Sequence, residues 1–198
     1  IKLLGCIMLI GIPFGILLGV IGGRYSKEIF TFIKGARFIT KVIPVLVFLF
    51  WLHYPLQGLL GIVIDPFWTT IFALGLLNTI AVASIISSEL ELLPKAYREA
   101  GITLNLTPNQ IIRYIELPLL FRRTIPKLLL IQASMLEYTL FASLISVPEL
   151  FKTAQSINAM IYKPVEIYSL LIFFFLIILG PLHLLIKWLD KKYVAQYD

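Results

Sequence analysis

The sequence predicts an all-α integral membrane protein with about five transmembrane helices, an outside N-terminus and a cytosolic C-terminus. Three observations support this fold class. Only 14% of the 198 residues are charged and the mean hydropathy is +0.93, a composition that excludes an ordinary water-soluble domain. Apolar runs of roughly 20 residues, the length that crosses a bilayer, recur along the chain. The basic residues gather between alternate runs.

Apolar runs and the proline, glycine or charged residues that end them define the predicted elements. The five predicted spans cover residues 3–23, 42–54, 66–86, 128–147 and 165–187. The first span is rich in glycine. The second is opened by Pro44 and interrupted at Pro55, which makes its bounds the hardest to define. Residues 1–198 therefore form a single transmembrane domain, with a polar segment at 87–127 and an extracytoplasmic segment at 148–164.

The distribution of basic residues predicts the orientation. With the N-terminus outside, the cytosolic stretches 24–41, 87–127 and 187–198 hold fourteen of the seventeen Lys and Arg residues. Cytosolic connections of membrane proteins carry such an excess. Because these residues lie between spans and not on one patch, the net charge of +6 does not indicate a nucleic-acid partner.

Signatures of catalysis and of nucleotide binding are missing from the sequence. No G-x-x-x-x-G-K-[ST] run occurs, so any ATP that drives this protein is bound by a partner. The two histidines, His53 and His183, are far apart on different spans, and Cys6 is the single cysteine. We therefore predict no catalytic residues, no metal site and no cofactor held by this chain.

The most ordered polar stretch is a corner between two short helices at residues 94–118. Asn105 suits the left-handed conformation that ends the first helix. Thr107 is a natural N-cap for the second, with Pro108 at its first position and Gln110 completing a capping box. Pro118 is expected to end this second helix.

The same stretch resembles the EAA loop of ABC importer permeases. That loop has Glu-Ala-Ala, three residues, Gly, nine residues and then Ile-x-Leu-Pro. A small residue replaces the second Ala here, and Asn, which also tolerates the left-handed conformation, replaces the Gly. The matching positions are Glu99, Ala100, Gly101, Asn105, Ile115, Leu117 and Pro118.

The C-terminal half is similar to the permeases of polar amino-acid importers, the histidine/glutamine/arginine group. The similarity lies in Leu93–Lys95, Val147–Leu150, Ala154–Gln155 and Tyr162–Tyr168. Several polar positions of that group differ here. Lys41–Pro44 stands for its Arg-Gly-Thr-Pro, Ser84 and Ser87 stand for a Glu and an Arg, and Glu137–Leu140 stands for a Lys-Asp-Thr-Ser-like run.

The resemblance implies a permease subunit in a bacterial inner membrane that forms a translocation path with a second, identical or different, permease. It implies a cytosolic ABC ATPase dimer that binds ATP and Mg²⁺, and a solute-binding protein that docks on outer loops including 148–164. The helix around Glu99 would enter a groove on the ATPase, with Ala100 and Gly101 allowing close approach, and carry the third and fourth spans with it.

Polar side chains inside the spans are the candidates for the path, because such groups are costly in hydrocarbon. In the third span Asn78, Ser84 and Ser88 fall at helical spacing with Ala81. Close helix packing through small residues is the alternative interpretation of this stripe. In the fourth span the candidates are Glu137, Tyr138 and Thr139. Glu137 would contact solute, pair with a cation of a neighbouring subunit or stay protonated.

Four other functions are alternatives to an amino-acid importer. A membrane-embedded enzyme requires paired carboxylates, a histidine cluster or an activated nucleophile, and an ion-coupled carrier requires an internal repeat and more intramembrane charge. The sequence shows none of these. A structural or sister subunit that makes few solute contacts, and an importer of another small polar solute, both stay open.

Overall fold

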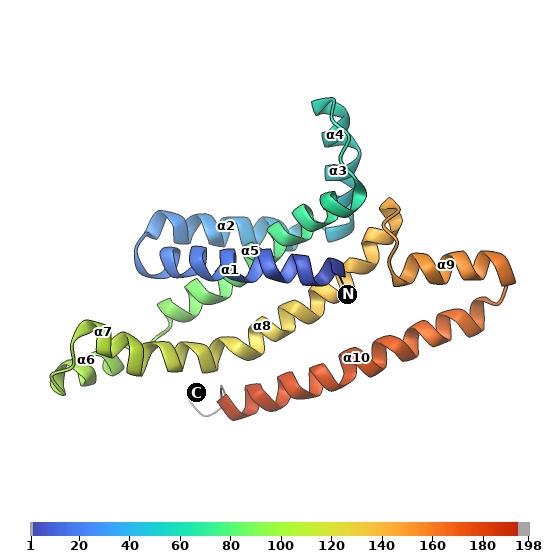
Figure 1. Ribbon diagram of the computed structural model, residues 1–198. Helices are drawn as coiled ribbons and strands as arrows, with labels where there is room; N and C mark the ends of the chain where they lie inside the picture. The colour runs from blue at the N-terminus through green and yellow to red at the C-terminus, as the bar shows by residue number, and fades with distance from the viewer. Residues whose placement is uncertain (1, 194–198) are drawn as a thin grey trace.

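The computed structural model describes residues 2–193, which contain helices and no strands. In Figure 1 the long helices run side by side, with α6 and α7 at one end of the bundle and α9 near the other. Residues 194–198 of the predicted cytosolic C-terminal stretch lie outside the described residues. The helices are α1 (Lys2–Arg24), α2 (Lys27–Val42), α3 (Val45–His53), α4 (Pro55–Leu60), α5 (Pro66–Glu91), α6 (Lys95–Thr103), α7 (Pro108–Ile111), the π-helix η1 (Ile112–Glu116), α8 (Leu117–Thr139), the 3-10 helix η2 (Leu140–Ile145), α9 (Leu150–Ile161) and α10 (Pro164–Tyr193).

Four helices in the described part are long and apolar enough to cross a membrane. They are α1, α5, α10 and the unbroken helix Pro108–Ile145, which comprises α7, η1, α8 and η2. The helix α2 and the pair α3–α4 make a fifth crossing if the two parts, bent by 95°, are counted as one span. The prediction of an all-α protein with about five apolar helices is therefore confirmed.

The prediction of a second span over residues 42–54 is wrong in its bounds. Residues 27–42 form α2, which packs along α1 and α5 instead of staying outside the bundle (Figure 1). Pro44 ends α2, because the residue before a proline is driven out of the helical conformation, and Ile43 is extended. The following α3 has nine residues and is only about 14 Å long, too short to cross a bilayer alone.

The prediction that Pro118 ends a helix is also wrong. Helical structure continues from Pro108 to Ile145. Just before Pro118 the chain makes one π-helical turn, in which the Leu117 N–H donates to the Ile112 carbonyl. In an α-helix the proline ring clashes with the carbonyl four residues earlier. The wider turn gives this carbonyl room, so the corner and the span share one helix.

A very close helix contact joins α1 to α5 through glycines. Gly11, Gly15 and Gly19 are buried, and each faces a side chain of α5. A Cβ atom on Gly11 would lie 2.5 Å from Asn78 Nδ2, and one on Gly15 would lie 2.6 Å from Val82 Cβ. Only glycine lets the two backbones come this close, which is a recurrent way of packing helices in membranes.

Substituting Gly15 with alanine is expected to destabilise the protein by about 1–3 kcal/mol, because the added methyl group overpacks this contact. The Cβ would also lie 2.9 Å from the Thr79 carbonyl oxygen, which cannot move aside cheaply. Thermal unfolding in detergent measures the effect. Gly5→Ala on the same helix is the matched control, since its Cβ meets nothing within 4 Å. Equal unfolding temperatures for the two variants would contradict the packing argument.

Candidate functional site

The corner between α6 and α7 has the local structure that its sequence predicts. Asn105 has φ 55°, in the left-handed region, and the Leu106 N–H donates to the Gly101 carbonyl at 3.0 Å. Thr107 and Gln110 form a capping box, with the Thr107 N–H donating to Gln110 Oε1 at 2.8 Å. These bonds satisfy backbone groups that the helix ends would leave free. The corner is therefore a defined structure that emerges from the bundle at one end (Figure 1).

Gly101 faces the inside of this corner. It is buried, and a Cβ atom there would lie 2.8 Å from Ile111 Cγ1 and 3.2 Å from Ile115 Cδ1. The small size of Gly101 is thus required for α6 to lie against α7 and η1 of the same chain. This packing within one chain is a reason for glycine that the sequence does not indicate, and the role of Gly101 in the approach of a partner stays a prediction. Glu99 and Ala100, the other two residues of the motif, are exposed.

Apolar side chains also face outward from the corner. Ile102 is 60% exposed and Leu104 is 71% exposed, beside the exposed Glu99 and Ala100. Large apolar side chains grouped on a polar protruding element are typical of protein interaction surfaces. We call Glu99, Ala100, Ile102 and Leu104 the outer face of α6.

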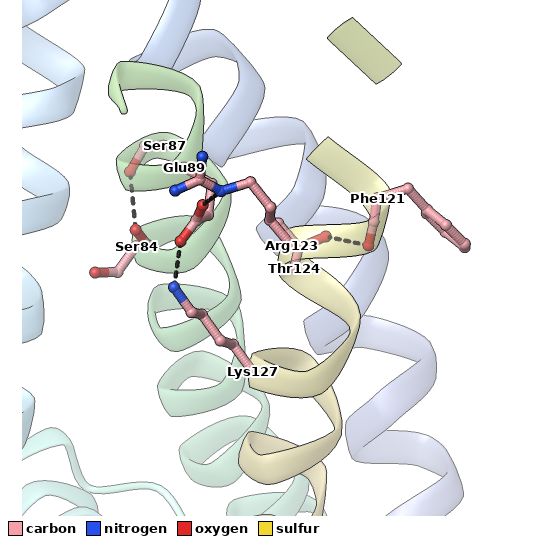
Figure 2. A network of polar contacts seen from close by, with 7 residues as sticks. All are labelled: Ser84, Ser87, Glu89, Phe121, Arg123, Thr124 and Lys127. Atoms are coloured by element: carbon pink, nitrogen blue, oxygen red, sulfur yellow. Dashed lines mark hydrogen bonds and ion pairs between the residues drawn. The ribbon is translucent and has the colours of Figure 1, made fainter. Parts of the chain in front are cut away.

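Two carboxylates hold the helices together at this end of the bundle. Glu89 of α5 is 2% exposed and accepts a hydrogen bond from Arg123 Nε at 3.0 Å and another from Lys127 Nζ. Figure 2 shows both cations reaching Glu89 from α8. Glu116 of η1 accepts a bond from Arg24 Nη1 at 3.0 Å. Each carboxylate therefore joins helices that are distant in the sequence.

These ion pairs were not predicted from the sequence. The signal for the first was present, because Arg123 and Lys127 are four residues apart and so share a face of one helix. An acidic residue near the end of the preceding span then completes the set. No spacing rule connects Glu116 with Arg24, since the two are 92 residues apart.

The predicted path residues of α5 lie in different surroundings. Asn78 is completely buried and pairs with Gln132 of α8, with hydrogen bonds of 3.2 Å and 3.0 Å in the two directions. This pair satisfies two amides in the core, so Asn78 serves helix packing. Ser84 and Ser88 are partly buried near the Glu89 end of the helix, where Ser87 donates to the Ser84 carbonyl (Figure 2).

The three candidates of α8 point in different directions. Thr139 is buried and donates to the Leu136 carbonyl at 2.7 Å. Glu137 is exposed in a groove of about 490 Å³ between α8 and α10, which is otherwise apolar except for His183. Tyr138 faces the opposite side, toward α2. The six predicted path residues therefore do not converge on one site.

Tyr138 lines a cavity of about 340 Å³ between α2, α3 and α8. Arg37, Thr40 and Lys41 of α2 provide its other polar groups, and Leu77, Met135 and Phe141 are among its apolar walls. Lys41 is among the positions singled out from the sequence. Arg37 is not, because residues 24–41 are predicted to lie outside the bundle. This cavity has the mixed lining that small polar ligands require. Across residues 2–193, no three His, Cys, Asp or Glu side chains are grouped to hold a metal ion.

Comparison with known families accounts for this architecture. The sequence model of the binding-protein-dependent transport system inner membrane component family matches residues 11–194. The chain belongs to this family. The resemblance to ABC importer permeases is thereby confirmed, and so is the assignment to a bacterial inner membrane. Members of this family work with a binding protein, as its description states.

Individual relatives of this permease are named for the transport systems to which they belong. The glutamine transport system permease protein GlnP of Escherichia coli (strain K12) is 28% identical over 194 residues, which cover 94% of this chain and 87% of GlnP. The arginine transport system permease protein ArtQ of Bacillus subtilis is 25% identical over 179 residues, covering 87% and 82%. The L-cystine transport system permease protein TcyB of Bacillus subtilis is 38% identical over 117 residues, covering 59% and 49%.

Solved structures confirm the fold of the permease. A crystal structure of an amino acid ABC transporter with histidines has a chain that superposes with a TM-score of 0.82 at 21% identity, covering 96% of this chain and 89% of that one. An inward-facing MetNI methionine ABC transporter superposes with a TM-score of 0.60 at 20% identity, covering 98% and 89%.

Replacing Glu89 by glutamine is expected to destabilise the permease by about 3–5 kcal/mol, because it leaves two cations near one uncharged buried group. Unfolding of the purified protein in detergent measures this. The control is Glu91→Gln, which removes a half-exposed pair with Lys34 at 3.3 Å and should cost under about 1 kcal/mol. A loss for Glu89→Gln no larger than the control would show that the buried pairs do not hold α5 to α8.

Proposed function

We propose that this chain is a permease subunit of an ATP-driven importer of amino acids. The observation that carries the proposal is the corner of residues 94–118, a defined polar element with an exposed apolar face that continues directly into a span. Family membership supports the importer class, and the transport systems named for the relatives support amino acids as solutes. A second permease, identical or different, completes the path.

The outer face of α6 is the contact for the ATPase. It offers Ile102 and Leu104 for apolar contact and the Glu99 carboxylate for a charge-assisted hydrogen bond. Since α7, η1 and α8 form one helix, a displacement of the corner reaches the membrane span without passing through a flexible loop. ATP and Mg²⁺ are bound by the ATPase dimer, and this chain contributes the mechanical connection.

The corner lies in the cytosol and the N-terminus outside. Arg37 and Lys41 lie in the second half of α2 and are therefore not counted as cytosolic. Of the seventeen Lys and Arg residues, twelve remain on the predicted cytosolic side. The bias still agrees with the excess of Lys and Arg on cytosolic sides. The α9 region and residues 148–164 are then on the outer side, where a binding protein delivers solute.

The cavity lined by Arg37, Lys41 and Tyr138 receives the solute. Its two cations suit the α-carboxylate that all amino acids carry, and the Tyr138 and Thr40 hydroxyls provide further hydrogen bonds. The remaining predicted path residues are scattered, which favours a sister permease that supplies other contacts. For that reason a heterodimer in which this subunit makes few solute contacts is the second candidate.

Ala100→Arg is expected to lower ATP-driven uptake at least tenfold, because a bulky cation on the outer face of α6 blocks docking of the ATPase. Uptake and co-purification of the ATPase with the permease are the measurements. Ala100→Ser is the matched control, since it keeps a small, uncharged side chain at the same exposed position. Full uptake and normal assembly of Ala100→Arg would reject this docking face.

Arg37→Gln is expected to reduce the uptake rate by roughly tenfold or more, the value of one lost charge-assisted hydrogen bond. Complex assembly and basal ATP hydrolysis should be unchanged. Lys27→Gln, at the other end of the same helix, provides the control for loss of a positive charge from α2. If the Arg37 variant transports like the control, this cavity is not the solute site.

A further inference from the structure

Glu116 occupies an unusual position in the fold. It is the last residue of the π-helical turn, and its side chain is 15% exposed. One carboxylate oxygen, Oε2, accepts from Arg24 Nη1 at 3.0 Å, and the other, Oε1, lies 3.9 Å from Arg98 Nε. Arg24 is the last residue of α1, and Arg98 lies in the middle of α6. A single carboxylate thus connects three elements.

The π-helical turn places Glu116 where it meets both arginines. An α-helix rotates by about 100° per residue, and a π-turn inserts one extra residue, which reorients every side chain that precedes it relative to those that follow. Pro118 follows two residues later, where the wider turn accommodates its ring. The backbone of this turn therefore sets the direction in which Glu116 points.

The ion pairs of Glu116 with Arg24 and with Arg98 differ in strength. Arg24 is 22% exposed at its side chain and forms the short contact, whereas Arg98 is 60% exposed and its contact is at the outer limit for an ion pair. Exposed pairs are weak and exchange readily with water. A cavity of about 250 Å³, lined by Arg24, Tyr97, Arg98 and Glu116 among others, leaves room for α6 to move against α1. The ion pair with α1 is therefore the stable contact, and the ion pair with α6 can break and re-form as α6 moves.

The end of α1 is itself fixed to α5. Besides the three buried glycines, Gly23 next to Arg24 faces Leu90, with an added Cβ at 3.0 Å from Leu90 Cβ. Such a contact does not let the two helices slide past one another. Glu89 in turn joins α5 to α8 through its ion pairs with Arg123 and Lys127. Glu116 thus provides the ion pair that joins the first helix to the corner.

We propose that Glu116 is a positioning residue for coupling: it ties α6 to the end of α1, so that a displacement of the corner moves α1 together with α5 and α8. This inference rests on the proposed function. Without Glu116 the corner still docks on the ATPase, but its displacement bends the π-turn instead of moving the bundle. The expected defect is therefore inefficient coupling, with assembly intact.

The experiment uses the complete transporter in liposomes, with its ATPase, sister permease and binding protein. Glu116→Gln should raise the number of ATP molecules hydrolysed per solute imported at least fivefold. The charge exchange Arg24→Glu with Glu116→Arg should restore at least half of the lost coupling, which a merely structural role would not predict. Glu91→Gln, the half-exposed pair with Lys34, is the matched control and should keep the normal ratio.

A distance measurement provides a second readout. Spin labels at Tyr25→Cys and Thr103→Cys, both exposed positions, in a Cys6→Ser background report the separation of α1 from α6. We expect a single narrow distance distribution without nucleotide, and a broad one in Glu116→Gln. If Glu116→Gln fails to assemble, Arg98→Gln removes the more exposed partner and should raise the ATP-to-solute ratio in the same direction.

The outcomes distinguish failure of this inference from failure of the proposed function. If the wild-type complex imports solute with ATP and Glu116→Gln keeps both its ratio and its narrow distances, this inference alone is overturned. If the wild-type chain neither binds the ATPase through α6 nor supports ATP-driven uptake, both the proposed function and this inference are rejected. A raised ratio restored by the charge exchange supports both.

Discussion

The contact between α1 and α5 is the constraint on which the arrangement of the other helices depends. Glycines at every fourth position of α1 bring its backbone against α5, so that Asn78 lies directly on Gly11. From there Asn78 reaches Gln132 of α8. In a membrane the hydrophobic effect does not drive helices together, so close van der Waals contact and buried hydrogen bonds must do so. The set of α1, α5 and α8 has both.

The same three helices are joined by charge at the end that bears α6. Glu89 links α5 to α8, and Glu116 of η1, the turn that leads into α8, pairs with Arg24 of α1 and Arg98 of α6. By contrast, among the residues of α10 only Ile186 is buried, and Glu137 faces the groove beside it. The protein thus consists of a rigid set of three helices with the corner attached, and of peripheral helices that leave large apolar surfaces for lipid or for a second permease.

Much of the corner could be predicted from the sequence because its signals are local. The left-handed Asn105 and the Thr107–Gln110 box depend on residues within a few positions of each other, and the backbone conformation of each follows from its own chemistry. Pro118 was misinterpreted for a related reason. A proline excludes one helical hydrogen bond, but whether the helix ends or widens into a π-turn depends on what surrounds it, here Ile111 and Ile115 packed against Gly101.

The sequence by itself determined that the chain is helical, apolar enough for about five crossings, and equipped with a polar corner of the importer-permease type, because hydropathy and short motifs report local properties. Only the tertiary structure decided that residues 27–42 return along α1, that Asn78 belongs to the core, that Arg37 and Tyr138 share a cavity and that Glu116 meets Arg24. These relations join residues tens of positions apart. They depend on how closely helices approach, which glycine permits and which no local pattern specifies.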